Sequence, residues 1–175
     1  MRNIAINEVD HLPRRVLGLG SDYPPDTLLP RHHHRRAQFL YAVNGLMKVE
    51  TDDGQWLVPP FSGVWIPANK PHRVWMPGVS THSLYIEPQD APRAGVRCEV
   101  LQVSPLLHQL LLAACQLPLL YEESGHDAAL IALLLFELQA APPLPMFTPL
   151  PQHPRLAELC SAFLRQPEIH STPEL

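Results

Sequence analysis

The sequence predicts a mainly β protein, in which a small barrel or sandwich of short strands is followed by a helical segment. Three observations carry this prediction. Short apolar runs recur between turn residues over the first hundred positions, apolar patterns with helical spacing follow from Ser104 onward, and prolines number 21 in a chain of 175 residues. Frequent proline favours short strands and stiff connections over long uninterrupted helices.

Eight apolar runs are the expected strands. Their close and regular spacing is typical of an all-β sandwich or barrel. Asp52-Asp53-Gly54 predicts a hairpin between two of these runs, and Asn44-Gly45 predicts another hairpin between the second run and the third. The eight runs cover residues 16–19, 38–43, 46–51, 55–58, 64–66, 73–76, 80–87 and 96–103.

Two helices are expected after the strands. Ser104 has the character of an N-cap and Pro105 follows it at the first helical position, so an apolar helix is predicted over 106–117. Ser124 begins the next helix, and Asp127 stands three residues later, as in a capping box.

The second of these helices, over 128–139, is apolar around nearly its whole circumference. A helix of this kind must be buried on several sides, and one face of a small barrel covers only part of it. We therefore expect a second copy of the chain to cover the rest, which makes the protein a homodimer. Packing between the barrel and the first helix within one monomer is the alternative. The apolar residues are Leu130, Ile131, Leu133, Leu134, Leu135, Phe136 and Leu138.

The remaining chain is predicted as a proline-rich linker without regular structure over 141–154, then an amphipathic helix over 155–165. Thr172 and the two residues after it resemble a helix start without a helix body. This pattern predicts a chain cut before a further domain, and a frayed natural tail is the alternative. We accordingly divide the chain into a barrel domain, 1–103, and a helical dimerisation and linker segment, 104–175.

Composition and net charge bear on the cellular compartment of the protein and on the partners that it can bind. A net charge of −4 argues against these residues forming the main nucleic-acid surface, which needs clustered Lys and Arg. The one basic cluster, 31–36, fits a solvated loop at least as well as a binding site. Cys98, Cys115 and Cys160 lie in apolar patterns and fit reduced core thiols of a cytoplasmic protein. We find neither a signal peptide nor a membrane span.

The most specific chemical pattern is a set of histidines. His32, His34 and Gln38 share parity, so one extended segment points all three the same way, whereas His33 points oppositely and is expected to be exposed. His72 opens a later strand. If the two strands lie side by side, three imidazoles converge inside the mouth of the barrel, an arrangement that suits zinc, nickel or iron. A metal-free polar ligand pocket and a purely structural role are the alternatives.

These residues resemble the two motifs of the cupin superfamily, with two departures. Gln38 stands where the family has an acid, and Asn69 where it has a glycine. The neutral amide of Gln38 would weaken metal binding relative to a carboxylate, whereas asparagine tolerates a left-handed turn. The matched positions are His32, His34, Gln38 and Gly45 in the first motif and Pro67, Asn69 and His72 in the second. The resemblance implies a cupin-type jelly-roll barrel, and the metal ligands that it implies are His32, His34, Gln38 and His72.

A closer likeness is to the N-terminal sensor domains of AraC/XylS-family transcription regulators. In that family the barrel binds a small effector, the helices dimerise, and a C-terminal pair of helix-turn-helix motifs reads DNA. The helical part after Ser104 also fits this organisation. The stretches that resemble the family are 32–45, 55–60 and 64–72.

The resemblance implies an effector-sensing and dimerising domain of a DNA-binding regulator rather than an enzyme. Its partners would be a second copy of the chain, a small-molecule effector whose binding residues the sequence does not assign, and DNA contacted by a part absent from this chain. A stand-alone metal-dependent cupin enzyme, such as a dioxygenase or isomerase, is the main alternative. Gln38 in the carboxylate position and the absence of a clear general base weigh against it. A dimeric binding module without signalling is a third possibility.

Overall fold

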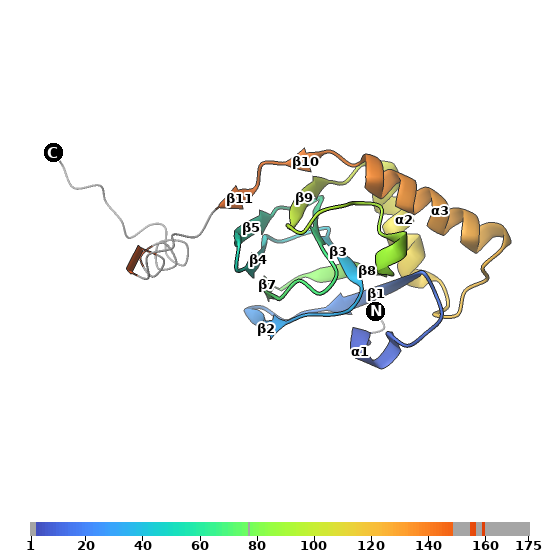
Figure 1. Ribbon diagram of the computed structural model, residues 1–175, viewed down its shortest axis with the longest axis horizontal. Coiled ribbons are helices and arrows are strands. Elements are labelled where there is room, and N and C mark those ends of the chain that lie inside the picture. Colours follow the sequence, from blue (N-terminus) through green and yellow to red (C-terminus); the bar gives the residue numbers. More distant parts are fainter. Residues whose placement is uncertain (1–2, 77, 149–154, 157–158, 160–175) are drawn as a thin grey trace.

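The computed structural model describes residues 3–76, 78–148, 155, 156 and 159, and Figure 1 shows how their helices and strands are arranged. Two antiparallel sheets face each other as a barrel, and two longer helices lie together on one side of it. The strands are β1 (Val16–Asp22), β2 (Thr27–His32), β3 (Ala37–Ala42), β4 (Met47–Thr51), β5 (Gly54–Val58), β6 (Ser62–Ile66), β7 (His72–Met76), β8 (Ser80–Ile86), β9 (Glu99–Gln102), β10 (Pro143–Leu144) and β11 (Phe147–Thr148). The helices are α1 (Ile6–Val9), the 3₁₀ turn η1 (Pro88–Asp90), α2 (Pro105–Gln116) and α3 (Gly125–Ala140).

The two sheets confirm the predicted mainly β, jelly-roll architecture. The helix-side sheet has the strand order β1-β8-β3-β6-β9-β10, and the opposite sheet has the order β11-β5-β4-β7-β2. Strand β2 was not among the eight expected runs because Pro30 and Arg31 interrupt its apolar pattern. Proline is tolerated there because β2 lies at the edge of its sheet.

Alternate side chains of the helix-side sheet belong to two different cores. Along β3, Leu40 and Ala42 join the cluster that fills the barrel interior together with residues of the opposite sheet such as Met47. Phe39 and Tyr41 join a second cluster, which the sheet shares with α2 and α3. This period-two alternation explains why every residue of β3 is buried.

The two predicted hairpins have different outcomes. Strands β4 and β5 pair with Thr51 opposite Gly54, so the hairpin at Asp52-Asp53-Gly54 is confirmed. The second prediction is wrong, because β3 pairs with β6 and β8 whereas β4 pairs with β5 and β7. Gly45 does adopt a turn conformation, with φ of 76°, but this turn carries the chain from one sheet to the other.

Helix α2 begins as predicted. Ser104 Oγ accepts a hydrogen bond from the Leu107 N–H, and Pro105 occupies the first turn. The helix packs on β1 and β8. Gly18 of β1 allows this close approach, because a Cβ at that position would stand 2.5 Å from the carbonyl oxygen of Ala114.

Helix α3 begins after Ser124, but the predicted capping box is wrong, because the Ser124 side chain makes no capping hydrogen bond. Gly125 follows with φ of 68°. This left-handed conformation turns the backbone away from the geometry in which Ser124 and Asp127 would cap each other.

One face of α3 is buried and another is open. Ile131, Leu134 and Leu138 pack into the core shared with α2 and the helix-side sheet. On the other side Leu133 is 43% exposed and Phe136 is 68% exposed, and Figure 1 shows α3 as the outermost element there. Packing within one monomer therefore covers only part of this apolar helix. We use the name α3 stripe for the exposed residues at helical spacing, Ala129, Leu133, Phe136 and Ala140.

The segment that follows α3 returns to the barrel, so the prediction of an irregular linker is wrong at 143–144 and 147–148, which form strands. Strand β10 pairs with β9 of the helix-side sheet, and β11 pairs with β5 of the opposite sheet. Leu144 and Met146 pack against the interior core. We use the name seam for residues 143–148, because they join the edges of the two sheets. Proline at position 143 is compatible with pairing because β10 is an edge strand.

Several other expectations fall at or beyond the limits of the described chain. Arg155, Leu156 and Leu159 are helical, whereas the rest of the helix predicted over 155–165 and the helix start at Thr172 lie outside the described residues. Cys98 and Cys115 are buried, as predicted, and Cys160 also lies outside. Within the described part of the chain, neither α2 nor α3 is both long and apolar enough to cross a bilayer.

Candidate metal centre

Three histidines converge at one mouth of the barrel. His32 ends β2 and lies directly opposite His72, the first residue of β7. His34 follows in the connection to β3, with its ring centroid 5.2 Å from that of His72. One ligand nitrogen from each of the three rings lies within 4.8 Å of the others. His33 is exposed.

The chain reaches this arrangement by a different route from the one predicted. His32, His34 and Gln38 do not share one extended segment, because β2 ends at His32 in the opposite sheet and β3 begins at Ala37 in the helix-side sheet. A hydrogen bond of 2.9 Å from the Asn69 N–H to the carbonyl oxygen of His34 ties the connection to the neighbouring turn. Asn69 has φ of 58°, the left-handed conformation for which asparagine is suited.

Backbone carbonyls fix the orientation of all three rings. A carbonyl oxygen only accepts hydrogen bonds, so each bonded Nδ1 carries the proton and each Nε2 presents a lone pair. Metal-ligating histidines use this arrangement, since their outer nitrogen is held by a second partner. The bonds run from Nδ1 of His32 to Pro30 O at 2.7 Å, from His34 to Arg36 O at 2.7 Å and from His72 to Lys70 O at 2.8 Å.

Gln38 lies beside His34, and two hydroxyl groups hold its side chain. Its amide nitrogen donates to Ser83 Oγ at 3.2 Å and to Tyr85 OH at 3.1 Å, which turns its Oε1 toward His34 Nε2 at 3.0 Å. Both of these facing atoms are acceptors when His34 carries its proton on Nδ1. His72 Nε2 is also buried, with no hydrogen-bond partner among the described residues. A cation among these atoms would satisfy their lone pairs, and the cluster of three histidines fits a divalent transition metal.

Burial keeps two of the three histidines in the form that binds a metal. Desolvation lowers the pKa of His72 to about 4, although its hydrogen bond to the Lys70 carbonyl opposes the shift. Desolvation also lowers the pKa of His34. Both rings are therefore neutral near pH 7, and a metal does not have to displace a proton from them.

Acid is expected to destabilise the metal-free protein through His72. An unfolded histidine has a pKa near 6.5, so as the pH falls below this value the unfolded chain takes up a proton that the folded ring refuses. The free energy of unfolding therefore decreases toward pH 4, by about 2 kcal/mol at a pH of about 5. Urea unfolding of chelator-treated protein measures this loss. The His72→Gln variant should lose less over the same interval, and an equal pH dependence would contradict the assignment.

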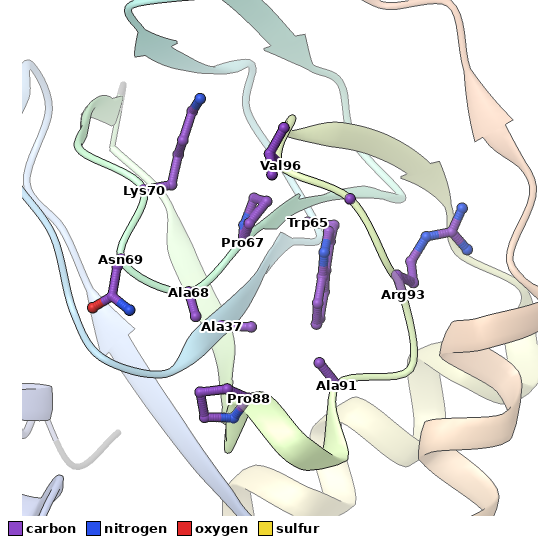
Figure 2. A pocket seen from close by; sticks show the side chains of 11 residues that line it. Ala37, Trp65, Pro67, Ala68, Asn69, Lys70, Pro88, Ala91, Arg93 and Val96 are labelled. Atoms are coloured by element: carbon purple, nitrogen blue, oxygen red, sulfur yellow. The ribbon is translucent and has the colours of Figure 1, made fainter.

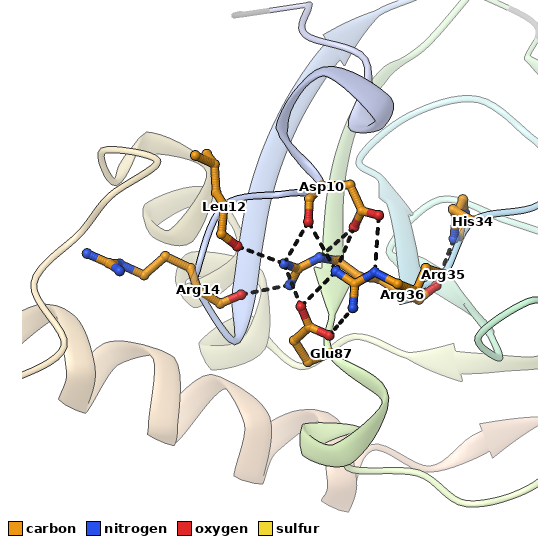
Figure 3. A network of polar contacts seen from close by, with 7 residues as sticks. All are labelled: Asp10, Leu12, Arg14, His34, Arg35, Arg36 and Glu87. Atoms are coloured by element: carbon orange, nitrogen blue, oxygen red, sulfur yellow. Dashed lines mark hydrogen bonds and ion pairs between the residues drawn. The ribbon is translucent and has the colours of Figure 1, made fainter.

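The buried residue Arg36 helps to position His34, and its burial was not predicted from the sequence. Arg36 belongs to the basic cluster 31–36, for which the sequence left a solvated loop and a binding role open, yet its side chain is 0% exposed. Figure 3 shows it surrounded by acceptors from the N-terminal segment and from Glu87. Its guanidinium contacts Asp10 Oδ1 at 2.8 Å, Glu87 Oε1 at 2.7 Å and the carbonyl oxygen of Arg14 at 2.7 Å. Because the Arg36 carbonyl also accepts the His34 Nδ1 proton, this network positions one of the three rings.

A jelly-roll barrel with a polar mouth and two helices packed on one sheet defines a cupin-type ligand-binding domain. Comparison with known proteins makes the class specific, because the family model described as the AraC-like ligand binding domain matches residues 17–139. The chain belongs to this family.

Comparison also finds individual proteins with a similar sequence or fold. The HTH-type transcriptional regulator NimR of Escherichia coli K12 is 27% identical over 139 residues, which are 79% of this chain and 50% of NimR. The chain therefore spans half the length of that relative. The crystal structure of apo ToxT K231A from Vibrio cholerae covers 87% of this chain and 65% of ToxT, with a TM-score of 0.52 and 8% identity, a likeness of fold alone. An RmlC-like cupin from Shewanella frigidimarina covers 41% of this chain and 66% of its own, at 16% identity and a TM-score of 0.38.

Proposed function

We propose that this chain is the effector-sensing and dimerising part of an AraC-family transcription regulator that works in the cytoplasm. The observation that carries the proposal is the match of the ligand-binding family model over 17–139. DNA would be read by a part of the protein outside this chain, since NimR is a helix-turn-helix regulator of about twice the matched length. Effector binding regulates DNA reading only if it favours one arrangement of the two parts over another.

We further propose that the sensor carries zinc, nickel or iron at its mouth. His32, His34 and His72 would hold the ion, and Gln38 would add a neutral oxygen. Bound metal would supply positive charge at the mouth and open coordination positions that water can fill. Two observations support this part of the proposal. One ligand nitrogen from each of the three rings lies within 4.8 Å of the others, and the buried His72 Nε2 has no hydrogen-bond partner among the residues that the structure describes.

We propose a second copy of the chain as the partner of the α3 stripe. An apolar row on the outermost helix is unfavourable in water, and a twofold axis lets the same face cover itself. The stripe carries no formal charge, so two copies can meet without burying an unpaired ion.

Substituting the stripe is expected to dissociate the dimer. Phe136→Glu would place two carboxylates in the interface, because each copy contributes one, and the dimer dissociation constant should rise at least about 100-fold. Sedimentation equilibrium at micromolar concentration measures this constant. Gln139→Glu adds the same charge to an exposed position of α3 outside the stripe and should change it by less than about threefold. A wild-type chain that is monomeric with α3 folded would contradict the dimer.

The alternative is a stand-alone metal-dependent enzyme, such as a dioxygenase or isomerase. The three-histidine centre is compatible with it, but the described side chains that hold Gln38 in place are the hydroxyls of Ser83 and Tyr85. Burial raises the pKa of the Tyr85 hydroxyl above its ordinary value near 10, so this group does not act as a base near neutral pH. We therefore propose a binding role rather than a catalytic one.

A fusion to a DNA-binding domain tests the regulatory proposal. A domain that recognises its operator only as a dimer, joined to the C-terminus of this chain, should repress a reporter gene, and Phe136→Glu should restore expression whereas Gln139→Glu should not. Metal depletion of the medium should change repression by the wild-type fusion more than by a His72→Ala fusion. Repression that is independent of both α3 and metal would overturn the proposal.

A further inference from the structure

A cavity of about 330 Å³ lies beside the histidine centre but outside the barrel. Figure 2 shows it around Trp65, between the turn 67–70 and the loop 88–96. The volume is at the lower end of the range for small-molecule sites. The residues proposed as metal ligands do not line it, and neither do those of the interior core.

The chemistry of the lining favours an uncharged ligand. Most of the wall is apolar, and the two cations at the cavity are already paired. Lys70 forms an ion pair with Asp53, and Arg93 Nε donates to Glu99 at 2.8 Å. An ionised ligand would find no uncompensated charge and would lose its hydration. The apolar residues of the wall are Ala37, Trp65, Pro67, Ala68, Pro88, Ala91 and Val96.

Residues that line the cavity are hydrogen-bonded both to the histidine centre and to the C-terminal end of α3, the two parts of the molecule on which sensing would depend. On one side, the carbonyl oxygen of Lys70 accepts the His72 Nδ1 proton at 2.8 Å, so the turn 67–70 is shared with the histidine centre. On the other side, Arg93 Nη1 donates to the carbonyl oxygens of Gln139 and Ala141, each at 3.1 Å, at the C-terminal end of α3. A molecule seated against the loop 88–96 is therefore one side chain away from the helix that carries the α3 stripe.

We propose that this cavity is the effector site of the sensor and that it binds a small, uncharged, mainly apolar molecule. The effector role rests on the proposed function, whereas binding itself does not. The metal would lie on the other side of the turn 67–70, and the effector would bias α3 through Arg93.

Three ring compounds of the same size and different charge test the ligand class. The probes are 4-fluorobenzyl alcohol, 4-fluorobenzoate and 4-fluorobenzylamine. Their binding to the purified chain is measured from the broadening of their ¹⁹F NMR lines. The neutral alcohol should bind with a Kd of about 1 mM or below, and the two ions should bind at least about tenfold more weakly because their charge must be desolvated. Equal or tighter binding of either ion would overturn the assignment of the ligand class.

A matched pair of variants tests the location. Ala91→Phe fills the cavity, whereas Ala94→Phe adds the same ring to an exposed position of the same loop that does not line it. Ala91→Phe should weaken binding of the alcohol at least about tenfold, and Ala94→Phe should leave it unchanged. Ala68→Leu fills the cavity from the opposite wall and should repeat the result if Ala91→Phe fails to fold. Absence of alcohol binding, or binding that both filling variants retain, would overturn the site.

Self-association tests the effector role separately. The alcohol at saturating concentration should shift the dimer dissociation constant of the wild-type chain at least about threefold and that of Ala91→Phe not at all. Binding without any shift would overturn the effector role and leave the binding site. Loss of reporter repression in the fusion experiment with alcohol binding intact would count against the proposed function and not against the cavity.

Discussion

His72→Ala is expected to remove nearly all metal from the purified protein. The substitution deletes one of three imidazole ligands, and loss of a mere outer-shell partner already costs about 10- to 100-fold in affinity, so metal affinity should fall at least about 100-fold. Elemental analysis after loading and dialysis measures the metal per chain. His32→Ala should give the same result, because His32 lies directly opposite His72 on the paired strand.

Position 33 provides the control. His33 stands next to two of the proposed ligands but is exposed, so His33→Ala should keep full metal content. If His32→Ala and His72→Ala both retain their metal, the centre is assigned to the wrong residues. If wild-type protein binds none of zinc, nickel and iron, the metal proposal fails while the fold and the cavity beside Trp65 are unaffected.

Arg36→Met should produce the largest loss of stability of any single substitution considered. The methionine fills much of the volume but removes the Arg36 donor from the carbonyl oxygen of Arg14, and leaves Asp10 and Glu87 with Arg35 alone. Removing one partner from a buried ionic network costs about 3–5 kcal/mol, and urea unfolding measures the change. Metal affinity should fall as well, because the Arg36 backbone holds the His34 ring.

Arg31→Met is the matched control for this substitution. Arg31 lies in the same basic cluster, but it is half exposed and its ion pair is with the exposed Asp52. Exposed pairs contribute at most about 1 kcal/mol. A loss below about 1 kcal/mol for Arg36→Met, or equal losses for the two variants, would mean that the buried network does not stabilise the N-terminal segment on the barrel.

The sequence predicted those features that depend on local patterns. The strand runs, the cap at Ser104 and the turn at Asp52-Asp53-Gly54 follow from side-chain periodicity and turn chemistry, which act over a few residues. The sequence also predicted that His32 and His34 lie close together, but the reason given, alternation along one strand, is not the one found. The two residues come together because the chain bends from one sheet to the other between them.

Features that depend on distant partners were not predicted. Nothing in the cluster 31–36 marks Arg36 as the buried member, because the acceptors that bury it come from Asp10, Leu12, Arg14 and Glu87. The Asn44-Gly45 turn has the composition of a hairpin, and only the pairing partners of β3 and β4 reveal a crossing between sheets. The role of Ser83 and Tyr85 in orienting Gln38 likewise requires knowledge of which strands are neighbours.

The seam has a consequence for how the molecule is made. Because 143–148 supply the final edge of both sheets, a chain emerging from the ribosome holds an open barrel until α2 and α3 have both been synthesised. During that interval two features lack their cover. One is the edge of β5, and the other is the ring of Trp56, whose centroid lies 4.9 Å from that of Phe147 in the finished protein. A fragment that stops at Ala140 would keep this gap permanently, so aggregation during expression should begin with truncations just short of the seam.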